Sequence, residues 1–275
     1  MANLNRYAEI ILGMEISASR RNFPAALRME TEGDLEVYYA PFDYVNVKAK
    51  ICICGITPGL QQAVLAINRV REELLSGSNH DDALKSAKEI ASFSGTMRDN
   101  LIAMLEMIGV SKLLDVESCA DLFGKQSDLV HYTSALRYPV IHKGRNYSGT
   151  PNMLFEPFLL KQIELYLKEE IGLLPEKCLY VPLGPRVSDV FSHLSGHGIL
   201  SPTRVLDGLP HPSGLNSERI SYFLGKKDRN SLSSRTSATK IDAAKAEILQ
   251  KISESYPLDL FIKANTGCEK SQITI

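Results

Sequence analysis

The sequence lacks the features that mark membrane-spanning, exported and strongly basic proteins. No apolar run approaches the ~20 residues that a membrane-spanning helix needs, and the opening MANLNRYAEI has no basic region leading into an apolar stretch. Lys plus Arg (31) nearly cancels Asp plus Glu (32), so no overall field attracts nucleic acid. We therefore expect a cytoplasmic protein with no membrane partner, in which any binding to DNA depends on a local basic face.

The cysteines show neither paired nor metal-like spacing, which argues against a disulfide framework and against a bound metal ion. Cys52 and Cys54 flank Ile53 in an apolar run, so on a strand both would point to the same face. We interpret them as small buried thiols. The sequence therefore predicts no metal site and no cofactor.

The chain does contain apolar runs of strand length that alternate with amphipathic segments of helical length. This alternation predicts an α/β protein, a three-layer α/β/α sandwich around a central, mostly parallel four-stranded sheet. The expected strands are ICICG (51–55), LVHYTSALRYP (129–139), CLYVPLG (178–184) and VLDGLPHPS (205–213). The segment 76–90 is polar and is expected to be a loop with a short helix.

With 275 residues, the chain has the length of one α/β domain, and we predict a single domain over 1–275. Residues 1–48 would hold an N-terminal helix and an extended segment, and 49–222 would form the core. Residues 223–275 would form a mobile basic loop and a C-terminal helix, since 226–240 are rich in Ser, Thr, Lys and Arg. The sequence does not indicate an oligomer, and we expect a monomer.

Two Gly- and Pro-containing turns follow expected strands. GITPG (Gly55–Gly59) follows the first strand, and HPSGLN (His211–Asn216) follows VLDGLP. Ligands bind outside the carboxyl ends of the strands in a parallel sheet. Glycines allow close approach of the backbone to a ligand, and a helix that begins after such a turn offers its positive end. We therefore place the candidate site between these turns.

Both turns resemble motifs of the uracil-DNA glycosylase superfamily. GITPG is similar to the first motif, most closely that of the mismatch-specific branch, and HPSGLN is similar to the second. Between them, Phe93–Gly109 and Pro157–Leu167 resemble stretches of the bacterial and archaeal branch that carries an iron–sulfur cluster. The cysteines that bind that cluster have no counterpart here. The resemblance runs in order over residues 50–220.

The resemblance implies a DNA glycosylase, which flips a base out of DNA and hydrolyses its N-glycosidic bond to leave an abasic site. The departing base is anionic, and His211 would stabilise its oxygen. Thr57 stands where the family orients water and would be the second catalytic residue. The base would stack on Phe93. The base-binding residues implied by the resemblance are Gly55, Ile56, Phe93 and Ser134.

DNA is the partner that the resemblance implies. Leu215 would wedge into the space that the flipped base vacates, and the neighbouring residues would contact phosphates. The full set of expected DNA contacts is Pro58, Gly59, Ser213, Gly214, Leu215, Asn216, Arg137, Lys143 and Arg145.

The chain departs from the family at two positions. The family has Asp or Asn at Thr57, or a Glu one residue earlier where this chain has Ile56, and it has Asn at Ser134. A threonine hydroxyl hydrogen-bonds water but does not take its proton at neutral pH. These differences leave three explanations open: an enzyme that relies on anion stabilisation, an enzyme for a bulkier or modified base, or a DNA-binding reader that does not excise.

Of these explanations we favour an active enzyme, with a uracil-like or modified base as its substrate. Modified bases of phage DNA, removed in antiviral defence, are one class that would fit. A catalytically weakened reader of damaged or modified bases is the alternative. A small-molecule enzyme on the same sheet architecture is a third hypothesis, because a fold does not fix a function.

Overall fold

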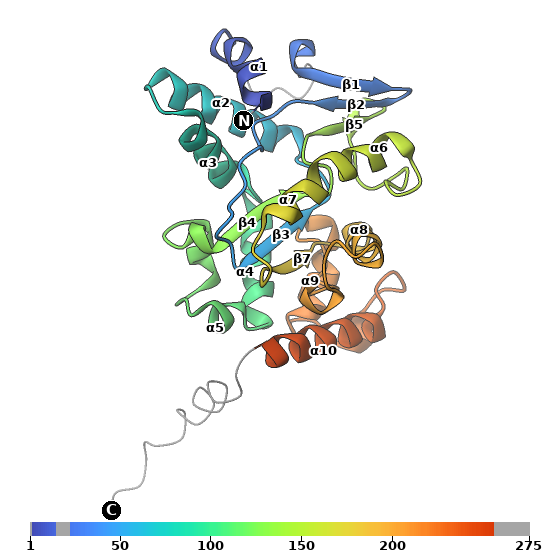
Figure 1. Ribbon diagram of the computed structural model, residues 1–275. Helices are drawn as coiled ribbons and strands as arrows, with labels where there is room; N and C mark the ends of the chain where they lie inside the picture. The colour runs from blue at the N-terminus through green and yellow to red at the C-terminus, as the bar shows by residue number, and fades with distance from the viewer. Residues whose placement is uncertain (1, 15–22, 256–275) are drawn as a thin grey trace, which may run out of the picture.

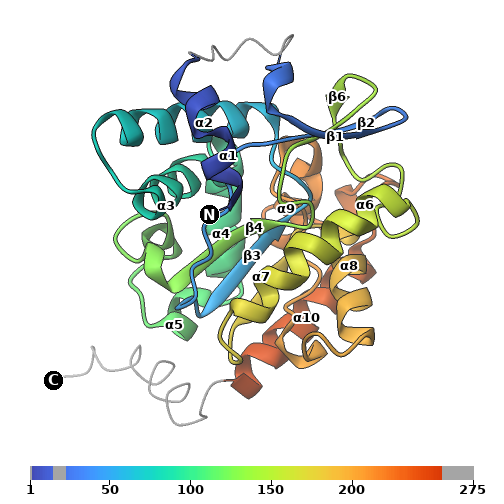
Figure 2. The ribbon, with the colours of Figure 1, turned by 45° about the horizontal axis from the view of Figure 1, so that its top comes forward.

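The computed structural model describes residues 2–14 and 23–255. Its centre is a parallel sheet in the order β4-β3-β7, formed by Val130–Ser134, Ile51–Gly55 and Leu179–Pro182 (Figures 1 and 2). The middle strand, β3, pairs in parallel with both neighbours. All three strands therefore end at one edge.

Helices cover both faces of this sheet, which confirms the predicted α/β/α layering. Ile51 and Ile53 of β3 belong to an apolar cluster with α4 (Thr96–Met107), α5 (Val110–Leu114), α9 (Ser217–Phe223) and α10 (Ala238–Ser255). Cys52 and Cys54 belong to a second cluster with α2 (Leu60–Leu75), α3 (His80–Ala91), α7 (Lys168–Leu173) and α8 (Pro185–Gly196). Both faces of the strand are buried, as expected for a parallel sheet. Cys52, Cys54, Cys119 and Cys178 are buried free thiols, and Cys268 lies outside the described residues.

The helices follow the predicted alternation with the strands. One continuous helical segment runs from Pro157 to Leu173. It consists of α6, a π-helical turn (η4) and α7. The α-helices are α1 (Ala2–Leu12), α2 (Leu60–Leu75), α3 (His80–Ala91), α4 (Thr96–Met107), α5 (Val110–Leu114), α6 (Pro157–Gln162), α7 (Lys168–Leu173), α8 (Pro185–Gly196), α9 (Ser217–Phe223) and α10 (Ala238–Ser255), and η4 is Ile163–Leu167. Short 3-10 helices occupy Ala25–Leu27, Cys119–Phe123, Ser127–Leu129, Pro202–Arg204, Gly214–Asn216 and Arg229–Ser231.

The predicted fourth parallel strand, 205–213, is wrong, because the central sheet has three strands. The segment does run beside β7, but it forms only two isolated bridges, Tyr180 to Val205 and Leu183 to Leu209. Leu183 comes three residues after Tyr180, whereas Leu209 comes four residues after Val205, so the register shifts by one residue between the two bridges. Gly208 lies in this slip with a φ of 110°, and the ladder cannot continue through it.

A second, antiparallel sheet was not predicted. It has the order β1-β2-β5-β6, formed by Arg28–Glu32, Leu35–Tyr38, Val140–His142 and Arg145–Asn146. Lys143 and Gly144, both with positive φ (52° and 70°), make the tight turn between β5 and β6. Figure 2 shows this sheet beyond the edge at which the parallel strands end, so its last hairpin lies near the candidate site.

Two segments are more regular than the sequence indicated. The polar segment 76–90 forms most of the twelve-residue helix α3 (His80–Ala91), whose N-terminus is capped by the Asn79 side chain. The basic segment 226–240 is held by Glu218, which accepts hydrogen bonds from Lys227 (2.9 Å), Ser233 (2.6 Å) and Thr236 (2.5 Å). The expected N-terminal helix stops at Leu12, and residues 15–22 of that stretch lie outside the described residues. No helix in the described part of the chain is long and apolar enough to cross a membrane.

Candidate active site

A cavity of about 230 Å³ lies at the carboxyl ends of β3 and β4. That is several times the ~30 Å³ that a water molecule occupies, so the cavity can hold a small organic group. Its wall is formed by six segments: the turn after β3, the end of β4, α3, the segment that leads to α4, the β6 hairpin and the His211 turn. The cavity is lined by Phe42, Gly55, Ile56, Thr57, Pro58, Gly59, Gln62, Lys88, Ser92, Phe93, Met97, Tyr132, Thr133, Ser134, Arg137, Asn146, Tyr147, Ser148 and His211.

The four residues predicted to bind the base all line this cavity. Gly55 is the link between two of them: a Cβ at this position would lie 3.5 Å from the Phe93 ring and 3.6 Å from the Ser134 hydroxyl. The glycine thus leaves room for the phenyl ring and the hydroxyl to approach the backbone at the end of β3. Ile56 follows on the same turn and is partly buried.

Phe93 is held in an unusual backbone conformation. Its φ is 48°, a left-handed value that is costly for a bulky residue, by ~1–3 kcal/mol. The side chain is buried and meets Tyr132 edge-on, with ring centroids 5.9 Å apart. Strain of this kind persists only where the surroundings fix it, and it clusters at functional sites. The strained backbone directs an aromatic ring into the cavity wall.

Thr57 has a structural use that the sequence did not reveal. Its hydroxyl donates to the Tyr138 carbonyl at 2.9 Å and accepts from the Val140 N–H at 3.2 Å. These bonds join the turn after β3 to the start of β5. With its proton already committed, the hydroxyl can only accept a hydrogen bond from a water molecule, so the geometry does not favour the catalytic role expected for Thr57.

The N-terminus of α2 is also engaged within the protein. The Gly59 N–H donates to Gln62 Oε1 at 2.9 Å, and the Leu60 N–H donates to Asn146 Oδ1 at 3.3 Å. The expected approach of these amides to a ligand is therefore replaced by capping from side chains. Asn146 belongs to β6, so the antiparallel hairpin is fastened to the cavity at this point. Pro58 is buried between these contacts.

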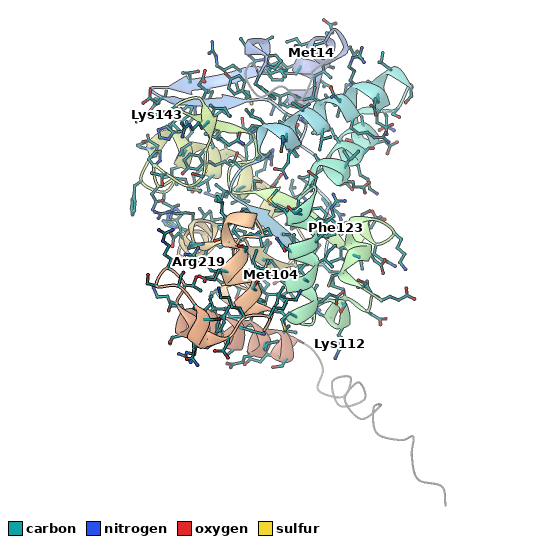
Figure 3. All side chains as sticks on the ribbon, turned by 180° about the vertical axis from the view of Figure 1, so that it is seen from behind. Met14, Met104, Lys112, Phe123, Lys143 and Arg219 are labelled. Carbon is teal, nitrogen blue, oxygen red and sulfur yellow. The ribbon has the colours of Figure 1, made fainter. Side chains whose placement is uncertain are left out.

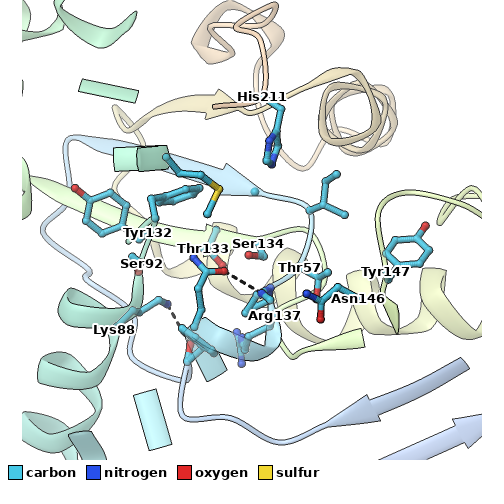
Figure 4. Close-up of a pocket in the computed structure, with 18 of the residues that line it drawn as sticks. Thr57, Lys88, Ser92, Tyr132, Thr133, Ser134, Arg137, Asn146, Tyr147 and His211 are labelled. Atoms are coloured by element: carbon cyan, nitrogen blue, oxygen red, sulfur yellow. Dashed lines mark hydrogen bonds between the residues drawn. The ribbon is translucent and has the colours of Figure 1, made fainter. Parts of the chain in front are cut away.

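His211 points into the cavity from the side opposite Lys88 and Arg137 (Figure 4). Its Nδ1 accepts the Ser213 backbone N–H at 3.2 Å, which places the ring proton on Nε2 in the neutral imidazole. Burial lowers the pKa of His211, so the neutral form prevails at neutral pH. A Cβ on Gly184 would lie 3.2 Å from His211 Cβ, so this glycine lets the His211 turn pack closely on the end of β7.

The remainder of the HPSGLN turn extends outward from His211. The Asn100 side chain anchors it through the Pro212 carbonyl (2.9 Å), and the Asn216 side chain donates to Ser213 Oγ at 3.2 Å. Leu215 lies in the short helix Gly214–Asn216 and is 98% exposed. The turn therefore combines a fixed imidazole with a fully solvent-exposed apolar side chain a few residues away.

Arg137 is not on the surface, contrary to the expectation that it contacts DNA phosphates. Its Nε lies 2.9 Å from Glu170 Oε1 as an ion pair that is not aligned as a hydrogen bond, and one Nη donates to the Tyr166 carbonyl at 3.0 Å. Lys88 Nζ lies 3.6 Å from the same carboxylate. The Thr133 hydroxyl donates to the other oxygen of Glu170. Arg137 thus belongs to a buried polar network that reaches the cavity wall.

Burial and charge set the protonation states of this network. Burial disfavours a charged Glu170, but Lys88 and Arg137 outweigh that effect and hold its pKa well below the usual range. Burial lowers the pKa of Lys88, although Glu170 opposes the shift. Burial, together with the nearby charge of Lys88, lowers the pKa of His131 to about 4. His131 is therefore neutral, with Nδ1 accepting the Asn46 N–H at 3.3 Å.

The two basic residues predicted on the β5–β6 hairpin do lie on the surface. Arg145 is exposed, and Lys143 makes only a loose ion pair with Asp34 at 3.7 Å. Exposed pairs of this kind contribute little to stability, so both cations can turn to another anion. In Figure 3, Lys143 and Arg219 lie towards the same side of the molecule, above and below the level of the parallel sheet.

Sequence reasoning missed Lys88, Glu170 and Asn146. Lys88 and Glu170 lie in amphipathic helices, where charged residues usually face solvent, and no local pattern shows that these two are buried. Asn146 lies in an exposed hairpin, and no local pattern shows that its side chain caps α2. Among residues 2–14 and 23–255, no group of His, Cys, Asp or Glu is placed to hold a metal ion.

Comparison with known proteins gives a family but no function. The chain is 33% identical over 219 residues to the uncharacterized protein YoxB of Bacillus subtilis (strain 168). The aligned region covers 79% of this chain and 86% of YoxB. The chain belongs to the YoxB family. No protein-family model matches the chain, and no solved structure matches it. Within the YoxB family, the chemistry of the cavity is the guide to what this member does.

Proposed function

We propose that the protein is a DNA glycosylase that flips a uracil-like or modified base into the cavity and hydrolyses its N-glycosidic bond. The observation that carries the proposal is the pairing of His211 with Phe93 and Ser134 in the lining of one cavity. This pairing supplies a donor for a leaving oxygen, an aromatic surface for a base and a hydroxyl for its edge.

The proposed reaction is dissociative. The bond between C1′ of the sugar and the base nitrogen breaks, and its electron pair leaves with the base. His211 donates a hydrogen bond through Nε2 to the developing oxyanion without transferring its proton. Water then adds to C1′ of the oxocarbenium-like sugar and releases a proton to solvent. A neutral imidazole fits this role, because it is a donor that does not compete as a general acid.

This scheme explains how catalysis proceeds although the Thr57 hydroxyl is committed to Tyr138 and Val140. Stabilising the anion lowers the barrier to bond cleavage, and the resulting cation reacts with water without strong activation. Removing one such donor in other enzymes costs ~10²–10³ in rate, so His211 can supply a large share of the acceleration. Glu170 is not a substitute base, since its low pKa makes it a poor proton acceptor.

The surroundings of the cavity suit a DNA substrate. Leu215 is 98% exposed beside the His211 turn, where it can fill the gap that a flipped nucleotide leaves in a duplex. Lys143 and Arg145 on the hairpin are available for phosphates. Ser213, Gly214 and Asn216, in the same turn as Leu215, are further candidate contacts to the phosphates of DNA.

A reader of damaged or modified bases, without excision, is the second candidate function. The observation in its favour is again Thr57: a side chain engaged in two structural hydrogen bonds leaves no water-activating group at the position where the superfamily keeps one. Both functions require the same cavity and wedge. They differ only in whether the glycosidic bond breaks.

An abasic-site assay separates the two functions. The full-length protein is incubated with duplexes that contain uracil or a mismatched base, and with genomic DNA from phages that carry modified bases. Alkaline cleavage then reports abasic sites. The glycosylase proposal expects cleavage by the unaltered protein and by His197→Ala, an exposed-histidine control, but not by His211→Ala. Tight binding without cleavage on every substrate would support the reader, and neither binding nor cleavage would overturn both.

A further inference from the structure

One wall of the cavity carries two fixed positive charges. Lys88 and Arg137 are the formally charged side chains among the described residues that line the cavity, and both are buried, at 4% and 8% exposure. Lys88 donates to the carbonyls of Phe42 (3.1 Å) and Tyr44 (2.6 Å). Unlike surface cations, these groups are held in place and do not have to be ordered when a ligand binds.

The carboxylates that neutralise this wall lie behind it. Glu170 contacts both cations but does not line the cavity. Asp43 acts on both at longer range and is itself held by the hydroxyls of Tyr39 (2.9 Å) and Tyr138 (2.5 Å). The network is therefore polarised, with its positive groups at the cavity and its carboxylates outside the cavity lining.

The two side-chain amides that line the cavity have their oxygen atoms engaged within the protein. The side-chain oxygens of Gln62 and Asn146 accept backbone N–H groups of Gly59 and Leu60. His211, on the opposite side, presents an N–H donor (Figure 4). A ligand in this cavity meets positive charge at the end formed by Lys88 and Arg137 and a neutral N–H donor at the end formed by His211, so it is expected to supply acceptors. A base edge with an amino group would find no partner of the right kind on these side chains.

We propose that the base taken by this cavity carries an anionic substituent, such as a carboxylate, which binds against Lys88 and Arg137. The base oxygen at the other end faces His211, and the ring stacks on Phe93. The inference depends on the proposed function for the nucleobase part of the ligand, whereas the preference for an anion follows from the wall itself. It names the substrate class that the motifs leave open.

Calorimetric titration of the full-length protein with free bases tests the preference without requiring excision. The ligands are uracil-5-carboxylate and uracil-6-carboxylate, each beside its carboxamide, which has the same shape without the charge. Benzoate serves as a carboxylate that lacks the base edge. Hydrogen bonds to charged groups are worth ~1.5–3 kcal/mol, so one carboxylate should bind about tenfold or more tighter than its carboxamide.

Equal affinity for carboxylate and carboxamide, or no binding of any base, overturns the inference. Benzoate binding as tightly as the best uracil carboxylate would overturn it too, because the wall would then be a general anion site. The outcome is separable from the proposed function. A preference for the carboxylate without formation of abasic sites would support the inference and exclude the glycosylase function. Excision of uracil without any preference for the carboxylate would support the glycosylase function and overturn the inference.

A matched pair of variants on α3 assigns the effect to the wall. Lys88→Met should abolish the preference for the carboxylate, whereas Lys85→Met, one turn earlier and ion-paired with Asp128 on the surface, should keep it. Lys88→Met leaves Glu170 with one partner fewer and can lose stability, so its thermal unfolding is measured in parallel. Should it fail to fold, the ligand series on the unaltered protein decides the question alone.

Discussion

The two edges of the parallel sheet both have a hollow lined with basic residues, yet only one resembles a site. The hollow at the amino edge, beside the starts of β3 and β7, is the larger, at about 750 Å³. It has more cations than the cavity at the carboxyl edge: Lys48, Lys50, Lys177 and Arg204. By size and charge alone, the amino edge would be preferred.

The difference is how the polar groups are held. At the amino edge the three lysines are exposed, and Arg204 rests on the Tyr180 ring with its centroid 5.8 Å away. At the carboxyl edge Lys88 and Arg137 are buried, His211 has a defined tautomer and Phe93 has a strained backbone. Preorganised groups act on a ligand without first being ordered. Immobilisation of its polar groups, more than charge or volume, distinguishes the candidate site.

The largest effect is expected from removing His211 at the carboxyl edge. His211→Ala should lower the rate of abasic-site formation ~10²–10³-fold, the usual result of losing one donor to a developing oxyanion. The rate is measured by alkaline cleavage under single-turnover conditions. His197→Ala, on the exposed end of α8, is the control and should retain the full rate. A His211→Ala rate within twofold of the unaltered protein would exclude the imidazole from the reaction.

The second prediction concerns the buried network behind the cavity wall. His131 has its folded-state pKa lowered from 6.5 to about 4, so between these pH values the unfolded state binds more protons than the folded state. Stability from this group is therefore complete above pH 6.5 and falls as the pH decreases towards 4, by up to ~1.4 kcal/mol per unit. Glu170, whose pKa is depressed, adds its own loss only at lower pH, as its carboxylate becomes protonated.

Urea unfolding of the unaltered protein and of His131→Gln across this range measures the effect. The variant should show a flatter pH dependence, while His197→Gln, which changes an exposed histidine, should not. Parallel pH curves for His131→Gln and the unaltered protein would show that His131 is not the titrating group.

The residues at the cavity were predictable from sequence to the extent that they follow parallel strands. Gly55 and Ser134 are the last residues of the parallel strands β3 and β4, and His211 follows a segment parallel to β7. The carboxyl ends of parallel segments share one edge of a sheet. Phe93 was predicted as a site residue only from the resemblance to the uracil-DNA glycosylase superfamily. The Lys88–Arg137–Glu170 network was out of reach, because it joins α3, the end of β4 and α7, and nothing local to any of these segments indicates a buried charge. The missing fourth strand depended on a one-residue slip at Gly208, which alternation of apolar residues does not report.

Substitutions at Thr57 test whether its hydroxyl stabilises the fold or takes part in the reaction. Thr57→Val keeps the shape but leaves the Tyr138 carbonyl and the Val140 N–H without their partner, which should lower the free energy of unfolding by ~1–3 kcal/mol. Thr57→Ser restores the hydroxyl and should recover most of this loss. The rate per folded molecule should be nearly unchanged in both. A Thr57→Val protein that is fully stable but inactive would return Thr57 to the reaction.

Leu215 is expected to matter for duplex DNA and not for folding. Because the side chain is 98% exposed, Leu215→Ala should change stability by less than ~0.5 kcal/mol. Excision from a duplex should slow by about tenfold, since the wedge no longer offsets unstacking, which costs a few kcal/mol. Excision from a single strand should be unchanged, because there is no stack to fill. Equal slowing on both substrates would show that Leu215 acts on the base or the sugar rather than on the duplex.

The smallest effect is expected from charge reversal at the amino edge. Lys50→Glu with Lys177→Glu reverses two charges of the larger hollow, yet both side chains are exposed. Stability, base affinity and the rate on a short duplex should all stay within about twofold, because surface charges away from the reacting atoms act weakly through solvent. The matched change at the other edge, Lys143→Glu with Arg145→Glu, should instead weaken duplex binding and reduce its dependence on salt, as expected when phosphate contacts are lost. If the amino-edge pair gave the larger loss of duplex affinity, DNA would cross the opposite end of the sheet. The cavity at the carboxyl edge would then have to take a ligand that is not part of a DNA strand.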